Sequence, residues 1–86
     1  MQLNLNTDYS FRVLMYTADN SDRQVSTQEI SDFHNISKNH LVKVVNHLGH
    51  LGYLSLKRGR YGGGISLAQK PEEINLGQVF RQVETT

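Results

Sequence analysis

Residues 37–52 read SKNHLVKVVNHLGHLG, and this stretch decides the fold. Its apolar residues recur with the period of about 3.6 residues that an amphipathic helix requires: Leu41, Val44, Val45, Leu48 and Leu51. Ser37 stands where an N-terminal cap is expected, and Gly52 follows the last apolar residue, as a left-handed C-terminal cap does. The pattern predicts a capped helix with one buried face and one exposed basic face.

A second, shorter helix is predicted just before this stretch. Ser26 and Glu29 have the spacing of a capping box, in which each side chain satisfies the backbone N–H of the other residue. Ile30 and Phe33 are then expected to point inward, and Ile36 to be a buried spacer in the turn. Two helices joined by so short a turn are typical of a helix-turn-helix.

A β-hairpin is predicted directly after the long helix. Residues 53–56 and 65–68 read as its two strands, separated by a loop with three consecutive glycines. Pro71 then breaks the pattern. Helical spacing of apolar residues resumes and is carried by Leu76, Val79, Phe80 and Val83.

The first helix is expected to begin at Thr7 or Asp8, either of which is a good cap, and to end near Asp19. Its apolar residues form two faces, one made by Phe11, Leu14, Met15 and Ala18 and the other by Tyr9, Val13 and Tyr16. Apolar residues on two sides predict a helix that is central to the domain or shared with a partner.

The predicted fold is therefore mainly α with a small β-hairpin, a winged helix-turn-helix in a single domain over residues 1–86. The helix-turn-helix is placed at about 28–51, the wing at about 53–68 and the start of a C-terminal helix at about 76–86. No signal peptide and no membrane span is visible, so a cytoplasmic location without a membrane partner is expected. The absence of cysteine excludes disulfides and thiolate metal sites within this chain.

Charge is divided sharply along the chain, although the net charge is only +1. Residues 37–70 contain no acid and six bases: Lys38, Lys43, Lys57, Arg58, Arg60 and Lys70. Residues 1–36 contain two bases and five acids, and residues 71–86 contain one base and three acids. An acid-free helix next to an acid-free hairpin predicts a surface for double-stranded DNA, a polyanion with two grooves.

The candidate DNA-contacting residues fall in two groups. The start of the predicted recognition helix supplies Ser37, Lys38, Asn39, His40 and Lys43. Asparagine pairs with adenine, lysine reaches guanine or phosphate, and a serine at a helix start suits a phosphate. The wing supplies Arg58, Arg60 and Tyr61, because an arginine on a thin glycine-rich loop can enter a narrow minor groove.

The sequence offers little for functions other than DNA binding. Four histidines are present, of which His47 and His50 could share a helix face, but no third metal ligand stands out. The glycine-rich loop fits no phosphate-binding signature, and no catalytic constellation is visible, so an enzyme is not expected. A protein-interaction module would need an exposed apolar patch, and an RNA-binding domain would need more stacking aromatics than Tyr61.

Several stretches, in the same order along the chain, resemble the NsrR/IscR group of bacterial winged-helix transcriptional repressors, and the nitric-oxide-sensing NsrR branch most closely. Residues 7–14, TDYSFRVL, resemble the family opening TDYxLRxL, and residues 36–45, ISKNHLVKVV, resemble the recognition helix SxNHLxKVV. Residues 58–67, RGRYGGGISL, resemble the wing RGxxGGxxL, and residues 74–81, INLGQVFR, resemble IxIGxVVR.

The resemblance implies a dimeric repressor that reads a palindromic operator and releases it when an iron–sulfur cluster reacts with nitric oxide. It also implies that Ser37, Lys38, Asn39, His40 and Lys43 are helix contacts, and that Arg58 and Arg60 are wing contacts. Family members continue with cluster-binding cysteines and a long dimerisation helix. This chain is therefore expected to be the DNA-binding domain alone, without a cofactor and with weak self-association. Asp8 becomes a candidate cluster ligand only where a longer chain supplies cysteines, and is otherwise expected to cap the first helix.

Overall fold

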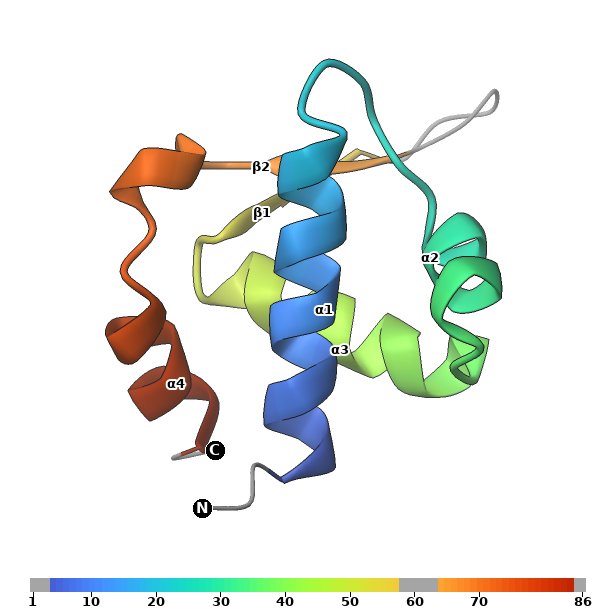
Figure 1. Ribbon diagram of the computed structural model, residues 1–86, viewed down its shortest axis with the longest axis horizontal. Helices are drawn as coiled ribbons and strands as arrows, with labels where there is room; N and C mark the ends of the chain where they lie inside the picture. The colour runs from blue at the N-terminus through green and yellow to red at the C-terminus, as the bar shows by residue number, and fades with distance from the viewer. Residues whose placement is uncertain (1–3, 58–63, 85–86) are drawn as a thin grey trace.

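The computed structural model describes residues 4–57 and 64–84 of the chain. In chain order the elements are α1 (Leu5–Asp19), α2 (Thr27–His34), α3 (Lys38–His50), β1 (Leu54–Leu56), β2 (Ile65–Leu67), a 3₁₀ turn (Pro71–Glu73) and α4 (Leu76–Glu84). Figure 1 shows α1 in the middle of the molecule, with α4 on one side and α2 on the other. The arrangement is the winged helix-turn-helix that the sequence predicts. No helix in the described part of the chain is long and apolar enough to cross a membrane.

Helix α1 is central to the packing, because it contacts α3, β2 and α4. The prediction of its start was wrong: the cap is Asn4, whose side chain accepts a hydrogen bond of 2.8 Å from the Thr7 backbone N–H. Thr7 lies inside the helix and is fully buried, so it cannot act as a cap. Asp8 also lies within the helix, where it pairs with Arg12 four residues on.

The buried face of α1 differs from the predicted one. Val13 and Leu14 are buried, but they share the interior with the small polar residues Thr7, Ser10 and Thr17. The hydroxyls of Ser10 and Thr17 donate to backbone carbonyls four residues earlier, at 2.8 and 2.7 Å, which satisfies two of these polar groups without water. Met15, expected inside, is 64% exposed.

Helix α2 begins as predicted. The Glu29 backbone N–H donates to the Ser26 hydroxyl at 3.0 Å, and the Ser26 backbone N–H donates to the Glu29 carboxylate at 2.8 Å. Ile30 is fully buried, whereas the prediction for Phe33 was wrong, because its side chain is 70% exposed. Its ring lies edge-on against Tyr16, with centroids 5.1 Å apart.

Helix α3 buries the predicted stripe, with Leu41, Val44, Val45 and Leu48 in the core and Leu51 half-buried. The helix is followed by Gly52 at a φ of 92°, the left-handed conformation for which a glycine was expected. Ser37 occupies the N-cap position, but its side chain makes no capping hydrogen bond, contrary to the expectation.

The wing is an antiparallel hairpin in the register Leu54–Leu67, Ser55–Ser66 and Leu56–Ile65. The segment before α2 adds an unpredicted bridge to it, because Val25 and Ile65 exchange backbone hydrogen bonds of 2.9 and 2.7 Å. Gly64 makes this approach possible, since a Cβ there would lie 2.6 Å from the Gln24 Cβ. The helix-turn-helix and the wing are thereby fastened together.

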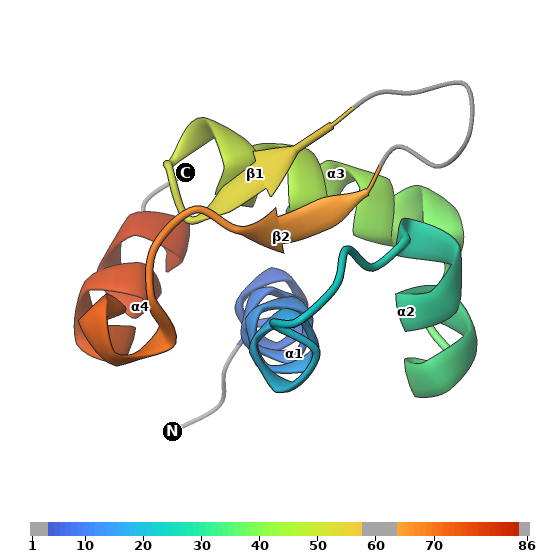
Figure 2. The same cartoon turned by 90° about the horizontal axis from the view of Figure 1, so that it is seen from above.

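Helix α4 closes the core beside α1 (Figure 2). Val79 and Val83 are buried as predicted, while Leu76 is exposed. The Tyr53 hydroxyl donates a hydrogen bond to the Gln82 side chain, which links α4 to the residue before β1.

Candidate nucleic-acid interface

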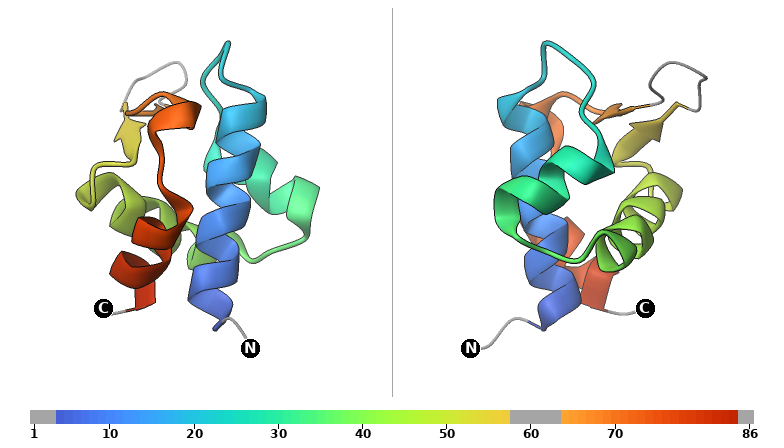
Figure 3. Two further views of the ribbon diagram at one scale, coloured as in Figure 1. Left: turned by 60° about the vertical axis from the view of Figure 1, so that its left-hand side comes forward. Right: turned by 90° about the vertical axis from the view of Figure 1, so that its right-hand side faces the viewer.

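The outward face of α3 is defined by the side chains that its packing leaves free of the core. Asn39, Val42, Lys43 and Asn46 follow the spacing i, i+3, i+4, i+7, and all four are exposed. We call these four residues the α3 outer stripe. The right-hand view of Figure 3 shows α3 and the hairpin on one side of the molecule and α1 on the other. The outer stripe and the wing therefore belong to the same side.

Two members of the outer stripe, Val42 and Asn46, were not singled out from the sequence. Val42 is 40% exposed, with an apolar surface of the kind that can contact a thymine methyl group. Asn46 lies two turns after Asn39 and repeats its side-chain chemistry. Both could have been found from the complement of the apolar stripe, because residues left out of a helix core share a face too.

The first turn of α3 is open to solvent. Ser37, Lys38 and Asn39 are exposed, and the first N–H groups of any α-helix have no intrahelical partner. Since the Ser37 side chain makes no capping bond, none of these groups is satisfied by its hydroxyl. The aligned peptide dipoles favour an anion at this end of the helix.

His40 lies at the same helix start but in a different environment. It is half-buried, and its ring lies edge-on to the Tyr9 ring of α1, with centroids 4.7 Å apart and planes at 69°. The structure therefore brings His40 together with the other predicted helix residues, yet places it against α1 as well.

The acids of the described residues fall in different secondary-structure elements from the proposed interface. No acidic residue is present in α3, β1 or β2. Among residues 4–57 and 64–84, salt bridges join Arg12 to Asp8 at 3.1 Å and Arg23 to Glu29 at 2.8 Å. Lys38 and Lys43 belong to neither pair, and their charges are not neutralised by one of these contacts.

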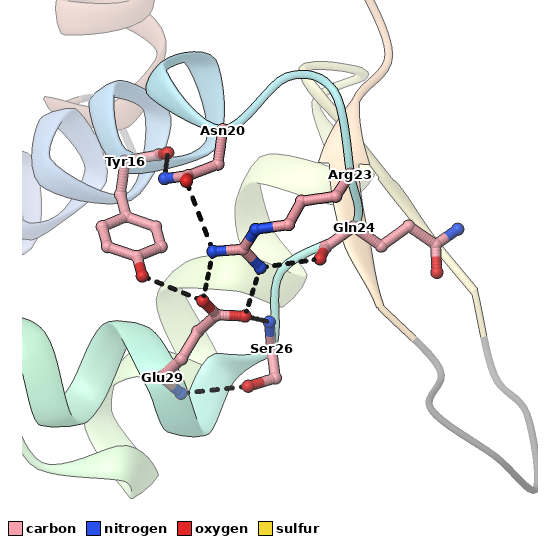
Figure 4. Close-up of polar contacts among 6 residues, drawn as sticks. All are labelled: Tyr16, Asn20, Arg23, Gln24, Ser26 and Glu29. Atoms are coloured by element: carbon pink, nitrogen blue, oxygen red, sulfur yellow. Dashed lines mark hydrogen bonds and ion pairs between the residues drawn. The ribbon is translucent and has the colours of Figure 1, made fainter.

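In the acid-rich residues 1–36, Glu29 forms a polar network that holds α2 in place. The Glu29 carboxylate accepts hydrogen bonds from the Tyr16 hydroxyl at 2.9 Å and from the Arg23 guanidinium at 2.8 and 3.1 Å (Figure 4). The Arg23 hydrogen bonds are the main reason why the pKa of Glu29 is lowered to about 2, and the Ser26 backbone N–H and the Tyr16 hydroxyl lower it further. This polar network ties α1 to α2, and α2 packs on α3.

Of the predicted wing residues, Arg58, Arg60 and Tyr61 lie outside the described residues. At the near end of the wing, Lys57 is exposed and its backbone N–H donates to the Gly64 carbonyl at 2.9 Å. The described part of the hairpin contacts α3 through β1.

The donor groups in the described part of the chain do not fit a metal cluster. Within the described residues no three His, Asp or Glu side chains are grouped so that they could hold a metal ion, and the sequence has no cysteine. The Asp8 carboxylate, the candidate cluster ligand of a longer chain, is instead paired with Arg12. His47 and His50, considered as a pair, do not form part of a larger ligand group.

The fold is a winged helix-turn-helix with an acid-free outward face on α3, and comparison with known proteins gives the family. Residues 3–86 match the family described as "Rrf2: Iron-dependent Transcriptional regulator". The chain belongs to the Rrf2 family, as the resemblance of its motifs had suggested. Proteins of this family are named as transcriptional regulators and not as enzymes.

Individual relatives agree with this assignment. The chain is 51% identical over 85 residues to the HTH-type transcriptional regulator NsrR of Bacillus licheniformis, covering 98% of this chain and 59% of the relative. The corresponding protein of Bacillus subtilis is 48% identical over 85 residues, covering 98% of the chain and 58% of the relative. The chain thus spans less than two thirds of these relatives.

Solved structures show the same fold. The cysteine regulator CymR of B. subtilis superimposes with a TM-score of 0.90 at 24% identity, over 100% of this chain and 67% of that one. IscR of T. potens superimposes with a TM-score of 0.87 at 23% identity, over 96% of this chain and 61% of that one.

Proposed function

We propose that this chain is the DNA-binding part of a transcriptional regulator, with α3 in the major groove and the hairpin in the adjacent minor groove. The observation that carries the proposal is the α3 outer stripe, an acid-free row of exposed side chains that continues the open first turn of the helix. A helix with a polar outer face and an unsatisfied N-terminus can both read bases and hold phosphate.

Each residue of the interface has a role that follows from its chemistry. Asn39 pairs with an adenine edge, Lys38 and Lys43 reach guanine or phosphate, and Ser37 contacts phosphate. Val42 and Asn46 extend the readout along the same face. His40 borders the interface at its edge near α1. Arg58, Arg60 and Tyr61 are proposed as minor-groove and phosphate contacts on the strength of their sequence alone.

The wider proposal is a repressor that acts as a homodimer on a palindromic operator in the cytoplasm. It is supported by the relatives named as transcriptional regulators and by the two-fold symmetry that dimeric helix-turn-helix proteins share with their half-sites. Residues 1–86 are taken as one domain, with the helix-turn-helix at about 28–51, the wing at about 53–68 and α4 as the start of the C-terminal helix. Iron–sulfur sensing is proposed only for a longer chain that supplies cysteines, as in the full-length family members that this chain resembles.

The test is a salt titration of binding to a DNA duplex. Lys38→Ala combined with Lys43→Ala is expected to weaken binding to every duplex and to lower the salt slope by about 1–2 units. Lys70→Ala is the matched control, because it removes an exposed basic residue outside α3 and the hairpin. Arg58→Ala with Arg60→Ala should behave like the α3 double variant, most strongly on A·T-rich duplexes.

A salt slope unchanged by either double variant would refute the proposed interface. Equal affinity for single-stranded RNA and duplex DNA would favour the RNA-binding alternative. Failure to bind nucleic acid, with retained folding, would favour a protein-interaction module, for which the exposed Phe33 and Met15 side chains offer an apolar surface.

A further inference from the structure

The ring pair formed by Tyr9 and His40 connects α1 to the first turn of α3, where base reading is proposed to begin. Both side chains are half-buried, and the separation of 4.7 Å with planes at 69° is the edge-to-face geometry that aromatic rings prefer. Neither the charge pattern nor the helical periodicity accounts for this contact. The Tyr9–His40 contact therefore needs a separate explanation.

The first turn of α3 has little other support on its outer side. Ser37 makes no side-chain cap, and Lys38 and Asn39 are exposed. Leu41 fixes the turn from the core side, where it is fully buried. The buried Ile36, just before the helix, is a further anchor, and Ser31 holds its backbone by hydrogen bonds. A second contact, from α1, adds a restraint on the first turn itself.

Tyr9 is well placed to provide that second contact, because its own backbone is held firmly. Thr7 and Ser10, on either side of it, are fully buried, and Asn4 caps the helix one turn earlier. Functional groups need to be held within about 0.5 Å by locked neighbours if their hydrogen-bond geometry is to be retained. Tyr9 meets this requirement for the first turn of α3.

We propose that Tyr9 is a positioning residue for the recognition helix: its ring holds the His40 ring and so sets the orientation in which Asn39 meets a base. The inference rests on the proposed DNA-binding function and adds a residue to it. Because the contact is between ring faces and edges, the aromatic ring of Tyr9 carries the role and its hydroxyl is dispensable. Tyr9 thus affects discrimination between sequences more than attraction to DNA in general.

The experiment compares Tyr9→Leu with Tyr9→Phe, which keeps the ring. Two duplexes are used, one selected by the wild-type chain from a random-sequence pool and one scrambled to the same composition. Tyr9→Leu should lower the ratio of the two affinities about two- to tenfold, and Tyr9→Phe should preserve it. Phe11→Leu is the matched control, since Phe11 is a half-buried aromatic residue of α1 outside this ring pair.

Two further measurements separate positioning from a loss of stability. In free protein, the imidazole ring protons of His40 should shift in NMR spectra of Tyr9→Leu and stay in place in Tyr9→Phe. In a His40→Ala background, Tyr9→Leu should have no further effect on the affinity ratio, because the two residues act as a unit. If Tyr9→Leu does not fold, Tyr9→Met serves as the ring-free variant.

The outcomes are distinguishable. If the pool yields no preferred sequence, the proposed sequence-specific function fails, and the inference fails with it. If a sequence is selected but Tyr9→Leu keeps the wild-type affinity ratio, or if its effect persists in the His40→Ala background, the positioning role alone is overturned.

Discussion

Helices α2 and α3 both have a serine at the N-cap position, but the two serines behave in opposite ways. At the start of α2, the Ser26 hydroxyl accepts from the Glu29 backbone N–H. The Glu29 carboxylate in turn accepts from the Ser26 backbone N–H, the Arg23 guanidinium and the Tyr16 hydroxyl. At the start of α3, the Ser37 side chain makes no capping bond. We call the α2 start closed, because a side-chain cap is present there, and the α3 start open, because Ser37 provides no side-chain cap.

The two helix starts therefore suit different roles: the α2 start stabilises the fold, and the α3 start keeps donors for a ligand. The capping box satisfies the backbone N–H groups of Ser26 and Glu29, so these donors are not available to a ligand and the α2 start stabilises the fold. An open start in an acid-free region retains donors that a phosphate can use. The chain places the Glu29 network at the first, and at the second Lys38 and Lys43, which belong to neither of the two salt bridges described above. Four predictions can break or sharpen this contrast.

The largest expected effect concerns what holds α3 in place without a side-chain cap. Leu41 is fully buried in the first turn of α3, so Leu41→Ala should lower the free energy of unfolding by about 2–5 kcal/mol. Urea unfolding followed by circular dichroism measures it. A loss below about 1 kcal/mol would mean that the open start is stabilised by something other than its apolar anchor.

The second prediction tests whether the start of α3 contacts DNA bases. Asn39→Ala should weaken binding to a selected duplex by about 1–3 kcal/mol, and binding to scrambled DNA much less. Its folding stability should be nearly unchanged, because the side chain is exposed. Equal losses on both duplexes would show that Asn39 contacts only the DNA backbone.

The features that the sequence predicted correctly are those with a local signal. The α2 capping box depends on two residues three apart, and the α3 core stripe on a period of about 3.6 residues. Gly52 was expected because few other residues tolerate its positive φ. The candidate interface stays a prediction; it was inferred from the acid-free block, since charge can be counted without knowing the fold.

The features that were missed depend on contacts between distant residues. Tyr16 and Arg23 join Glu29 from 13 and 6 residues away, and no spacing rule brings them together. Phe33 looked like a core residue, but α2 turns it outward against Tyr16. The interior face of α1 escaped detection because buried Ser10 and Thr17 satisfy their hydroxyls on their own helix.

The third prediction compares the two serines directly. Ser26→Ala should lower the free energy of unfolding by about 1 kcal/mol, because it removes a capping bond. Ser37→Ala should change it by less than about 0.5 kcal/mol, since no such bond is lost. Thermal melts of the two variants side by side are sufficient. Equal destabilisation would show that the α3 start is capped in solution, and the contrast between the helices would disappear.

The last prediction uses pH to measure how much the Glu29 charge at the start of α2 contributes to the free energy of unfolding. The pKa of Glu29 is lowered from 4.5 to about 2 in the folded protein, chiefly by its hydrogen bonds with Arg23. A carboxylate whose pKa falls on folding stabilises the protein above its unfolded pKa, and that stability is lost as pH falls toward the folded value. Because the side chain is 30% exposed, solvent screening limits the expected contribution to about 0.5–1 kcal/mol.

In Glu29→Gln this contribution is absent at every pH, so the difference in unfolding free energy from wild type should be widest near neutral pH and should narrow between about pH 4.5 and pH 2. Asp8→Asn is the control, because it breaks the exposed pair with Arg12 and leaves the α2 start intact. A gap for Glu29→Gln that stays constant over that pH range would mean that the Glu29 charge does not stabilise this helix start, and that its hydrogen bonds alone do.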